Sequence, residues 1–256
     1  MSNVTTTVYL RGEPEWRRGS LLDQLPRKIH EELVAMGRPV TYRVGEVLTE
    51  QGSSHSPVFF VLDGVVKATR AAQPDGLLML LGLSLRGDAA GVADALLGKQ
   101  SHVTYTAVKR TRAIVLPRDV FTTAVRGDHR ALSAVCTVLA HEVRLRDMSL
   151  SFATMEVESR LIAFLGRLQR ACGKPTPVGS YIDLGLRQSD YAAAIGASQP
   201  AVGKALRKLS REGKIAVGYR SLKNRLSPQS PAVERVSGGT RAVERASRVA
   251  VKRNSL

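Results

Sequence analysis

Cysteine is scarce in this sequence, and long hydrophobic runs are missing. The 256 residues include two cysteines, Cys136 and Cys172. They are too few and too far apart for a disulfide framework, a C-x-x-C zinc site or a cysteine-ligated iron–sulfur cluster. No stretch approaches the roughly 18 consecutive apolar residues of a membrane span. The first 19 residues have no apolar segment behind a basic start, so we expect no secretory signal and a reducing, cytoplasmic location.

Sequence patterns that carry catalysis are also missing. The five histidines are scattered along the chain, without the spacing of metal ligands. We find no Ser/His/Asp order, no paired carboxylates suited to acid–base chemistry and no phosphate-binding P-loop. An enzyme is therefore the least favoured class of function, and we expect no metal and no cofactor.

Acidic residues are outnumbered, mainly in the second half of the chain. The formal net charge is +16, and residues 141–256 carry 21 Lys and Arg against 9 Asp and Glu. The first 140 residues carry 17 against 13. A basic half of this kind favours contact with a polyanion, above all nucleic acid. An anionic membrane surface or simple solubility would also account for the charge.

Hydrophobic periodicity predicts helix, then strand, then helix again. Ser20–Met36 carries a helical stripe that we expect to be interrupted near Pro26. Asp63–Gly64 separates two β-branched runs and predicts a β-hairpin. After Pro117 the pattern returns to helix. Many short strands with turn signals between them predict a small barrel or sandwich. The runs lie at 58–62, 65–69, 103–108 and 113–117.

A long helical segment from Asp128 to Leu150 carries apolar residues at alternating spacings of three and four, followed by a skipped turn. Such a seam suits packing against a second helix or against the β-domain of the same chain. Cys136 lies on the seam, which favours a small core side chain over a redox sensor. The seam consists of Leu132, Cys136, Leu139, Val143 and Leu150.

The pattern from Arg187 to Arg220 predicts a helix-turn-helix. A helix over Gln188–Ile195 ends at Gly196, and Ser198 is a natural N-cap for a second helix with Pro200 in its first turn. The second helix of such a unit enters the DNA major groove. We expect it to bury Val202, Leu206 and Leu209 and to expose Gln199, Ala201, Gly203, Lys204 and Arg207.

These residues resemble the Crp/Fnr family of transcription regulators, named after the cyclic-AMP receptor protein and the fumarate–nitrate regulator. The resemblance runs from about residue 20 to residue 225. Segments 43–48, 51–52 and 58–67 are similar to the opening hairpins of the family's cyclic-nucleotide-binding barrel, and 87–91 to the start of its phosphate-binding cassette. In the second half it rests on Val157, Glu158, Arg160, Leu161, Gln188, Asp190, Ala192, Gly196, Ala197, Ser198, Val202, Ala205, Leu206, Leu209, Glu212, Gly213 and Ile215.

The resemblance implies an α+β fold. It consists of an N-terminal cyclic-nucleotide-binding-like β-barrel of jelly-roll type, a long dimerisation helix and a C-terminal winged helix-turn-helix. A polar, basic tail poor in aromatic residues should follow, disordered or only transiently helical. The expected boundaries are 1–19 for an irregular lead, 20–126 for the sensor domain, 127–153 for the dimerisation helix, 154–227 for the DNA-binding domain and 228–256 for the tail.

The DNA-reading residues depart from the family pattern. Many members begin the recognition helix with Arg-Glu where this chain has Gln199-Pro200, and Lys204 replaces a second base-reading arginine. Glutamine contacts adenine and lysine reaches guanine, so the DNA sequence that is read should differ. The candidate base-reading residues are Ser198, Gln199, Pro200, Ala201 and Lys204. The candidate phosphate contacts, which set register without specificity, are Arg187, Gln188, Arg207, Lys214, Arg220, Lys223 and Arg225.

The ligand site implied by the resemblance is degenerate. Val92 stands where nucleotide binders place the glutamate for the ribose, and Ser101-His102 replaces the Arg-Ser pair that meets the phosphate. A buried phosphate loses its charge-assisted partner, which disfavours cyclic AMP bound in the usual mode. Donors from His102 or Lys99 would suit another nucleotide or anion, and haem on His102 or His141 is a further alternative. The candidate site comprises Gly91, Val92, Ala93, Ser101, His102, Leu145 and Arg146.

We therefore expect a homodimeric, sequence-specific transcription regulator. Two recognition helices about 34 Å apart would require a pseudo-palindromic operator. The resemblance also implies a contact between the barrel and RNA polymerase, and no membrane partner. The open alternatives are a barrel that responds to no ligand, a regulator gated through a non-standard site, and a cyclic-nucleotide-binding protein acting through a protein partner.

Overall fold

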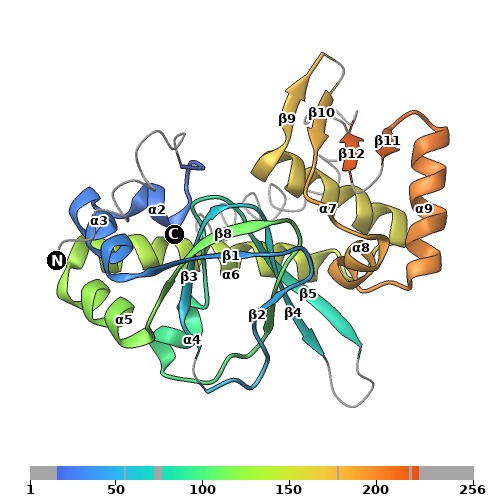
Figure 1. Cartoon of the computed structure of the whole chain (residues 1–256). Helices are drawn as coiled ribbons and strands as arrows, with labels where there is room; N and C mark the ends of the chain where they lie inside the picture. Colours follow the sequence, from blue (N-terminus) through green and yellow to red (C-terminus); the bar gives the residue numbers. More distant parts are fainter. Residues whose placement is uncertain (1–15, 55, 72–76, 178, 219–220, 225–256) are drawn as a thin grey trace, which may run out of the picture. The chain divides into compact units, whose positions relative to one another are not determined.

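The computed structural model divides the chain into two compact units, residues 1–147 and 148–256, which we describe separately (Figure 1). Among the described residues, no helix combines the length and apolar character needed to cross a membrane. The expected tail at 228–256 lies outside the described residues, as does most of the expected lead. The described residues are 16–54, 56–71, 77–177, 179–218 and 221–224.

The first unit is built on two four-stranded antiparallel sheets, ordered β1-β8-β3-β6 and β2-β7-β4-β5. Its helices are α2 (Leu21–Gln24), α3 (Arg27–Met36), α4 (Val92–Leu97), α5 (Arg118–Gly127) and the first part of α6 (His129–Ser151). Its strands are β1 (Arg38–Tyr42), β2 (Val47–Thr49), β3 (Val58–Asp63), β4 (Val66–Ala71), β5 (Leu78–Ser84), β6 (Ala89–Ala90), β7 (Thr104–Ala107) and β8 (Thr111–Leu116).

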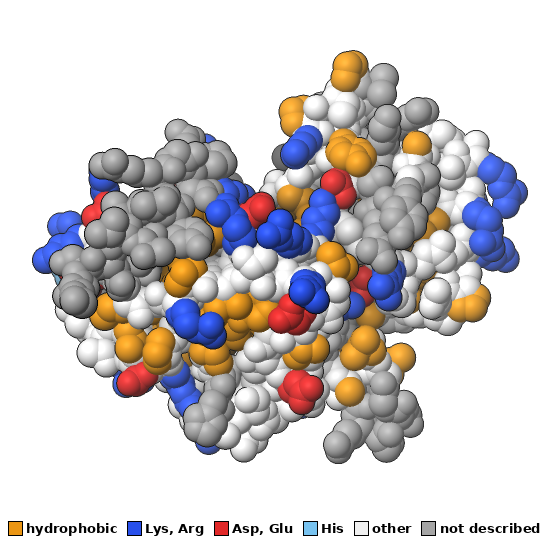
Figure 2. Space-filling model, viewed as in Figure 1, with side chains coloured by type: hydrophobic (Ala, Val, Ile, Leu, Met, Phe, Trp, Pro, Cys, Tyr) orange, Lys and Arg blue, Asp and Glu red, His pale blue; other side chains and the backbone are white. Residues whose placement is uncertain are grey.

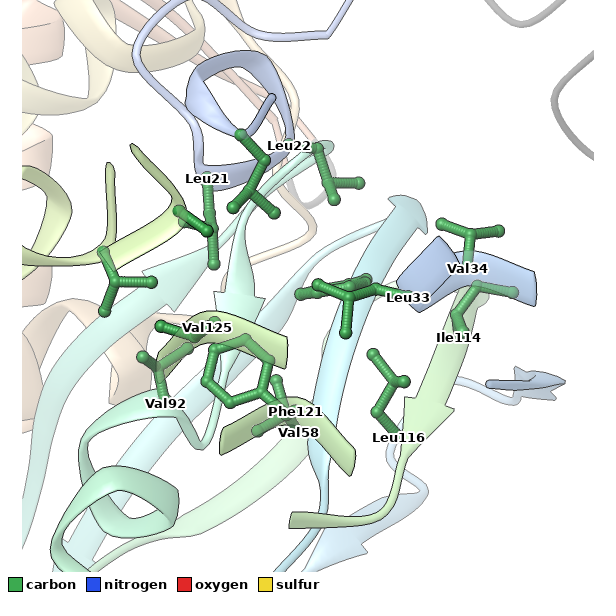
Figure 3. Packing of buried hydrophobic residues seen from close by; sticks show 14 of the residues in the cluster. Leu21, Leu22, Leu33, Val34, Val58, Val92, Ile114, Leu116, Phe121 and Val125 are labelled. Atoms are coloured by element: carbon green, nitrogen blue, oxygen red, sulfur yellow. The ribbon is translucent and has the colours of Figure 1, made fainter. Parts of the chain in front are cut away.

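Strand β3 contributes to two hydrophobic clusters, one between the sheets and one between the strands and the helices. Its apolar run is uninterrupted because both faces are buried. Phe59 and Val61 point into the core between the sheets, where they meet Tyr105 of β7. Phe60 instead joins the helices, packing edge-on against Phe121 of α5 at a centroid distance of 6.1 Å. Figure 3 shows this second cluster, with side chains from α2, α3 and α5 gathered over the strands.

The expected break of the first helix at Pro26 is confirmed, because α2 ends before it and α3 starts after it. The hairpin expected at Asp63–Gly64 is wrong. Strand β3 pairs with β6 and β8, whereas β4 pairs with β5 and β7, so this turn passes from one sheet to the other. Gly64 has φ 98°, and a Cβ there would lie 2.6 Å from the carbonyl oxygen of Arg110. Glycine is therefore needed here because two segments of the backbone pass close to each other, and not because the turn closes a hairpin.

Helix α6 buries one side in the first unit and exposes the other. Ala131, Ala134 and Val135 lie in the helix-covered core. Leu139 is partly buried against the same core. Cys136 is exposed, so the expectation of a small core side chain is wrong for the single chain. The other seam residues Leu132, Val143 and Leu150 are 40%, 53% and 72% exposed.

The second unit holds three helices and a four-stranded sheet of order β11-β12-β10-β9 within its described residues. Leu161 and Leu165 of α7 are fully buried, as are Val202 and Leu209 of α9, so the helices share an apolar core. The last two strands, β11 and β12, pair in antiparallel orientation after α9. The elements are α7 (Val157–Cys172), β9 (Lys174–Thr176), β10 (Gly179–Ile182), α8 (Gln188–Ile195), α9 (Gln199–Arg211), β11 (Ile215–Gly218) and β12 (Ser221–Asn224).

Candidate DNA-binding unit and sensor site

Helix α9 begins where the sequence predicts. Ser198 has extended backbone angles, and its hydroxyl accepts a hydrogen bond from the Ala201 N–H at 3.4 Å. Pro200 occupies the first turn, where its missing N–H leaves no bond unmade. Gln199 and Lys204 are exposed. The expected base-reading residues therefore share the first turns of one helix, with the two side chains able to reach base edges open to solvent.

Gly203 corrects one detail of the expected exposed face. It is buried, not exposed. A Cβ at this position would lie 3.3 Å from Oε1 of Gln188, the first residue of α8. The absence of a side chain therefore lets Gln188 lie against α9. This brings a candidate phosphate contact from α8 up to the recognition helix.

The turn between α8 and α9 is held by an arginine from a third helix. Gly196 ends α8 in the left-handed region at φ 59°. Arg160 of α7 donates from Nη1 to the carbonyl oxygens of Ile195, at 2.7 Å, and Gly196, at 3.2 Å. A cation at a helix C-terminus satisfies unpaired carbonyls and complements the helix dipole. The sequence places Arg160 only in a linking helix, and nothing local to it indicates this contact.

Two further contacts fix the helices of this unit. The Asp190 carboxylate, which is buried, accepts from the backbone N–H of Arg187 at 2.8 Å and so caps α8. Lys208 of α9 pairs with Glu158 of α7 at 2.6 Å. The first contact fixes the start of α8, and the second links α9 to α7.

The candidate phosphate contacts differ in their surroundings. Arg187, Gln188 and Arg207 are exposed. Lys214 pairs with Glu212 at 2.7 Å, so a phosphate would have to compete with that carboxylate. Lys223 lies in β12, and Arg220 and Arg225 lie outside the described residues. Figure 2 shows lysine and arginine side chains on the outer edge of this unit, over α9.

The candidate ligand site in the first unit starts at Gly91. This residue has φ 86° and precedes α4. Its backbone N–H donates to the Tyr105 hydroxyl at 3.1 Å. Burial raises the pKa of Tyr105 to about 12. Val92 is buried in the helix-covered core and Ala93 is half-buried.

The Ser101-His102 pair is already engaged within the chain. The Ser101 hydroxyl is buried and donates to the Val103 carbonyl oxygen at 2.8 Å. The His102 N–H donates to Asp94 Oδ2 at 3.2 Å, and His102 Nδ1 lies 2.8 Å from Asp94 Oδ1. Lys99, the other suggested donor, is exposed. Neither Asp94 nor Tyr105 could be identified from the sequence, because each lies inside a pattern typical of an ordinary helix or strand.

The two candidate ligand residues on α6, Leu145 and Arg146, are both exposed. Arg146 pairs with Glu142 at 3.5 Å. Burial raises the pKa of Glu142; Arg146 lowers it, Asp88 raises it and His102 lowers it. These influences place Glu142 in the electrostatic surroundings of the same site. His141, suggested above as a haem ligand, is exposed, and the described residues contain no cluster of acidic, histidine or cysteine side chains suited to a metal ion.

Comparisons with known proteins agree with this arrangement. Residues 39–128 match the cyclic nucleotide-binding domain family, and residues 159–225 match the Crp-like helix-turn-helix domain family. A global nitrogen regulator from Synechocystis sp. is 31% identical over 168 residues, which cover 64% of this chain and 73% of the relative.

Solved structures show the same fold. A CRP-family transcriptional regulator from Thermus thermophilus is 26% identical, with a TM-score of 0.63, over 78% of this chain and 96% of that one. The c-di-GMP-responsive global regulator of Xanthomonas campestris has a TM-score of 0.67 at 17% identity, over 79% of this chain and all of that one. The second likeness concerns the fold alone.

Proposed function

The chain belongs to the Crp/Fnr family of transcription regulators, and we propose that it binds a pseudo-palindromic operator as a homodimer without gating by cyclic AMP in the usual mode. Members of this family regulate transcription and are not enzymes, and the chain binds DNA through its helix-turn-helix. Recognition of an operator is supported by helix α9. This helix is capped at Ser198 and packed against α7 and α8, and it exposes Gln199 and Lys204 in its first turns. We place its action in the cytoplasm, with RNA polymerase as a further partner.

The exposed seam of α6 supports a homodimer. Leu132, Val143 and Leu150 recur along one helix and are 40%, 53% and 72% exposed in the single chain. Exposed apolar residues at this spacing favour burial against a second helix of the same kind. A twofold axis along this helix would give the two recognition helices the symmetry that a pseudo-palindrome requires.

The sensor site supports independence from cyclic AMP. The site has Ser101 and His102 where a phosphate would need an arginine, and the described surroundings add the carboxylates of Asp94 and Glu142. A phosphate that is buried without a charged donor loses its hydration, and no charge-assisted hydrogen bond offsets that free-energy cost.

A charge placed on the seam tests the dimer. We expect Val143→Glu to shift the protein from dimer to monomer in sedimentation velocity and to abolish binding to an operator-length duplex. The matched control is Met36→Glu, because Met36 is 52% exposed and Val143 is 53% exposed, and Met36 lies on a different helix. The control should remain dimeric and bind DNA. A V143E protein that stays dimeric, or a wild-type protein that is monomeric when bound to DNA, would refute the proposal.

A further inference from the structure

Two backbone N–H groups at the ends of residues 91–102 are satisfied from within the sensor unit. The Gly91 N–H donates to the Tyr105 hydroxyl at 3.1 Å, and the His102 N–H donates to Asp94 Oδ2 at 3.2 Å. Loops with free N–H groups are what proteins use to hold phosphates and other anions. In this chain, side chains already take up both donors.

Asp94 is a buried carboxylate paired with an imidazole. Its side chain is 4% exposed, and that of His102 is 35% exposed. The imidazole Nδ1 lies 2.8 Å from one carboxylate oxygen and 2.9 Å from the other. Burying a carboxylate is costly unless it is paired and hydrogen-bonded. The contacts with His102 supply that compensation from both its backbone and its ring.

Two other donors near the site are also in use. The Ser101 hydroxyl donates to the Val103 carbonyl oxygen at 2.8 Å. Arg118 donates to the carbonyl oxygens of Lys99, at 3.2 Å, and Ser54, at 2.8 Å. The Ser101 hydroxyl has a single proton and cannot donate to an incoming anion without giving up its bond to Val103. Two of the five N–H groups of Arg118 are already engaged within the chain.

The charges around the site act against an anion. Asp94 and Glu142 both help to hold the pKa of Tyr105 up, behind the larger effect of burial, and Arg146 opposes them. Arg146 is itself paired with Glu142 at 3.5 Å. An entering phosphate would therefore meet two carboxylates and an arginine that is already paired.

We propose that the Asp94 carboxylate is a built-in anion of the sensor domain, which takes the His102 N–H and imidazole that an external phosphate would need. Phosphate-bearing ligands, cyclic nucleotides included, are excluded because the Asp94 carboxylate already occupies the hydrogen-bonding groups that a phosphate would need. This inference rests on the proposed function, which assigns the sensor role to residues 91–102.

The test removes the built-in anion and asks whether an external one can enter. In full-length protein, Asp94→Ser removes the carboxylate and opens space, and Asp94→Ala removes both the charge and the acceptor for the His102 N–H. Asp119→Ser, at a position in the first turn of α5, removes the same charge elsewhere in the unit. Thermal unfolding is followed with cyclic AMP and, separately, with millimolar sulfate against chloride at equal ionic strength.

We expect D94S to gain cyclic AMP or sulfate binding about tenfold or more tighter than wild type, the scale of one charge-assisted hydrogen bond. Wild type and D119S should show no stabilisation by either anion. If D94S loses cooperative unfolding, D94A decides by the same criterion. Wild type stabilised by cyclic AMP as strongly as D94S, or a folded D94 variant that gains no anion binding, would overturn the inference.

DNA binding, measured on the same samples, separates this inference from the proposed function. A folded D94S that gains no anion binding while wild type binds its operator refutes only the role of Asp94. Wild type that fails to bind DNA while D94S gains anion binding refutes only the proposed function.

Discussion

Gln199 and Lys204 lie in the first turns of α9, where we expect side chains to reach base edges, whereas we expect the other basic residues of the unit to contact phosphates. A glutamine amide both donates and accepts, so it can distinguish adenine, whereas a lysine placed on a phosphate contributes charge alone. Both side chains are exposed, and the helix that carries them is held from its buried side. Specificity should therefore depend on these two residues, and affinity on a wider set.

We predict that Gln199→Ala lowers affinity for the preferred site by about 1–3 kcal/mol and relaxes the preference at one base pair in each half-site. Arg207→Ala, the comparison at an exposed candidate phosphate contact, should weaken binding to all sequences alike and reduce the salt dependence of binding by about one charge. Competition binding against single-base variants of the site measures both. A Q199A protein with unchanged base preference would remove this residue from the reading set.

At the residue scale, the sequence predicted the exposure of the candidate DNA-reading side chains better than it predicted the contacts of buried residues. Gln199 and Lys204 could be found because helical periodicity fixes which positions face outward. Asp94, Tyr105 and Arg160 could not, because their partners His102, Gly91 and Ile195 come from other elements, and only the folded chain brings them together.

At the element scale, one arginine of α7 connects this helix to the turn between α8 and α9. Arg160 of α7 reaches the last carbonyls of α8, just before the turn into α9. Hydrogen bonds from a charged donor contribute more than neutral ones, on the order of 1.5–3 kcal/mol. The angle between α8 and α9 should therefore depend on this arginine, although it lies outside both helices.

We predict that Arg160→Ala lowers the unfolding free energy of the second unit by about 1.5–3 kcal/mol. It should also weaken operator binding while leaving the base preference unchanged, because the reading side chains are intact but less well oriented. Arg170→Ala is the matched control, since Arg170 lies on the same helix and is exposed. Denaturant unfolding and competition binding supply the two readouts. Equal effects of R160A and R170A would show that the contact does not orient the turn.

At the element scale, the turn at Asp63–Gly64 shows where local rules fail. The dipeptide is a strong hairpin signal, yet the strands on either side belong to different sheets. A left-handed glycine is needed wherever the chain bends sharply or passes close to other backbone, and the sequence does not say which. The break at Pro26 was predictable because proline interrupts the helix in which it lies, whatever other elements pack against that helix.

On the scale of the whole molecule, charge and exposed apolar surface lie on different parts of the chain. Beyond α6, residues 152–256 carry 19 Lys and Arg against 7 Asp and Glu. The exposed apolar seam lies on α6, which ends at Ser151 before the DNA-binding helices start. The charge balance could indicate DNA binding and the periodicity an apolar seam, but whether the first unit binds a ligand depends on a few buried contacts that neither reveals.

The central claim is that this regulator recognises a pseudo-palindromic operator without cyclic AMP. Its most direct test is selection of bound sites from a random DNA pool by the full-length protein, with no nucleotide and with added cyclic AMP, cyclic GMP or a cyclic dinucleotide. We expect the same two-half-site motif, with half-site centres about one helical turn apart, in every condition including the one without nucleotide. Enrichment only when one nucleotide is present would contradict the account of the sensor site, and no enrichment in any condition would contradict the account as a whole.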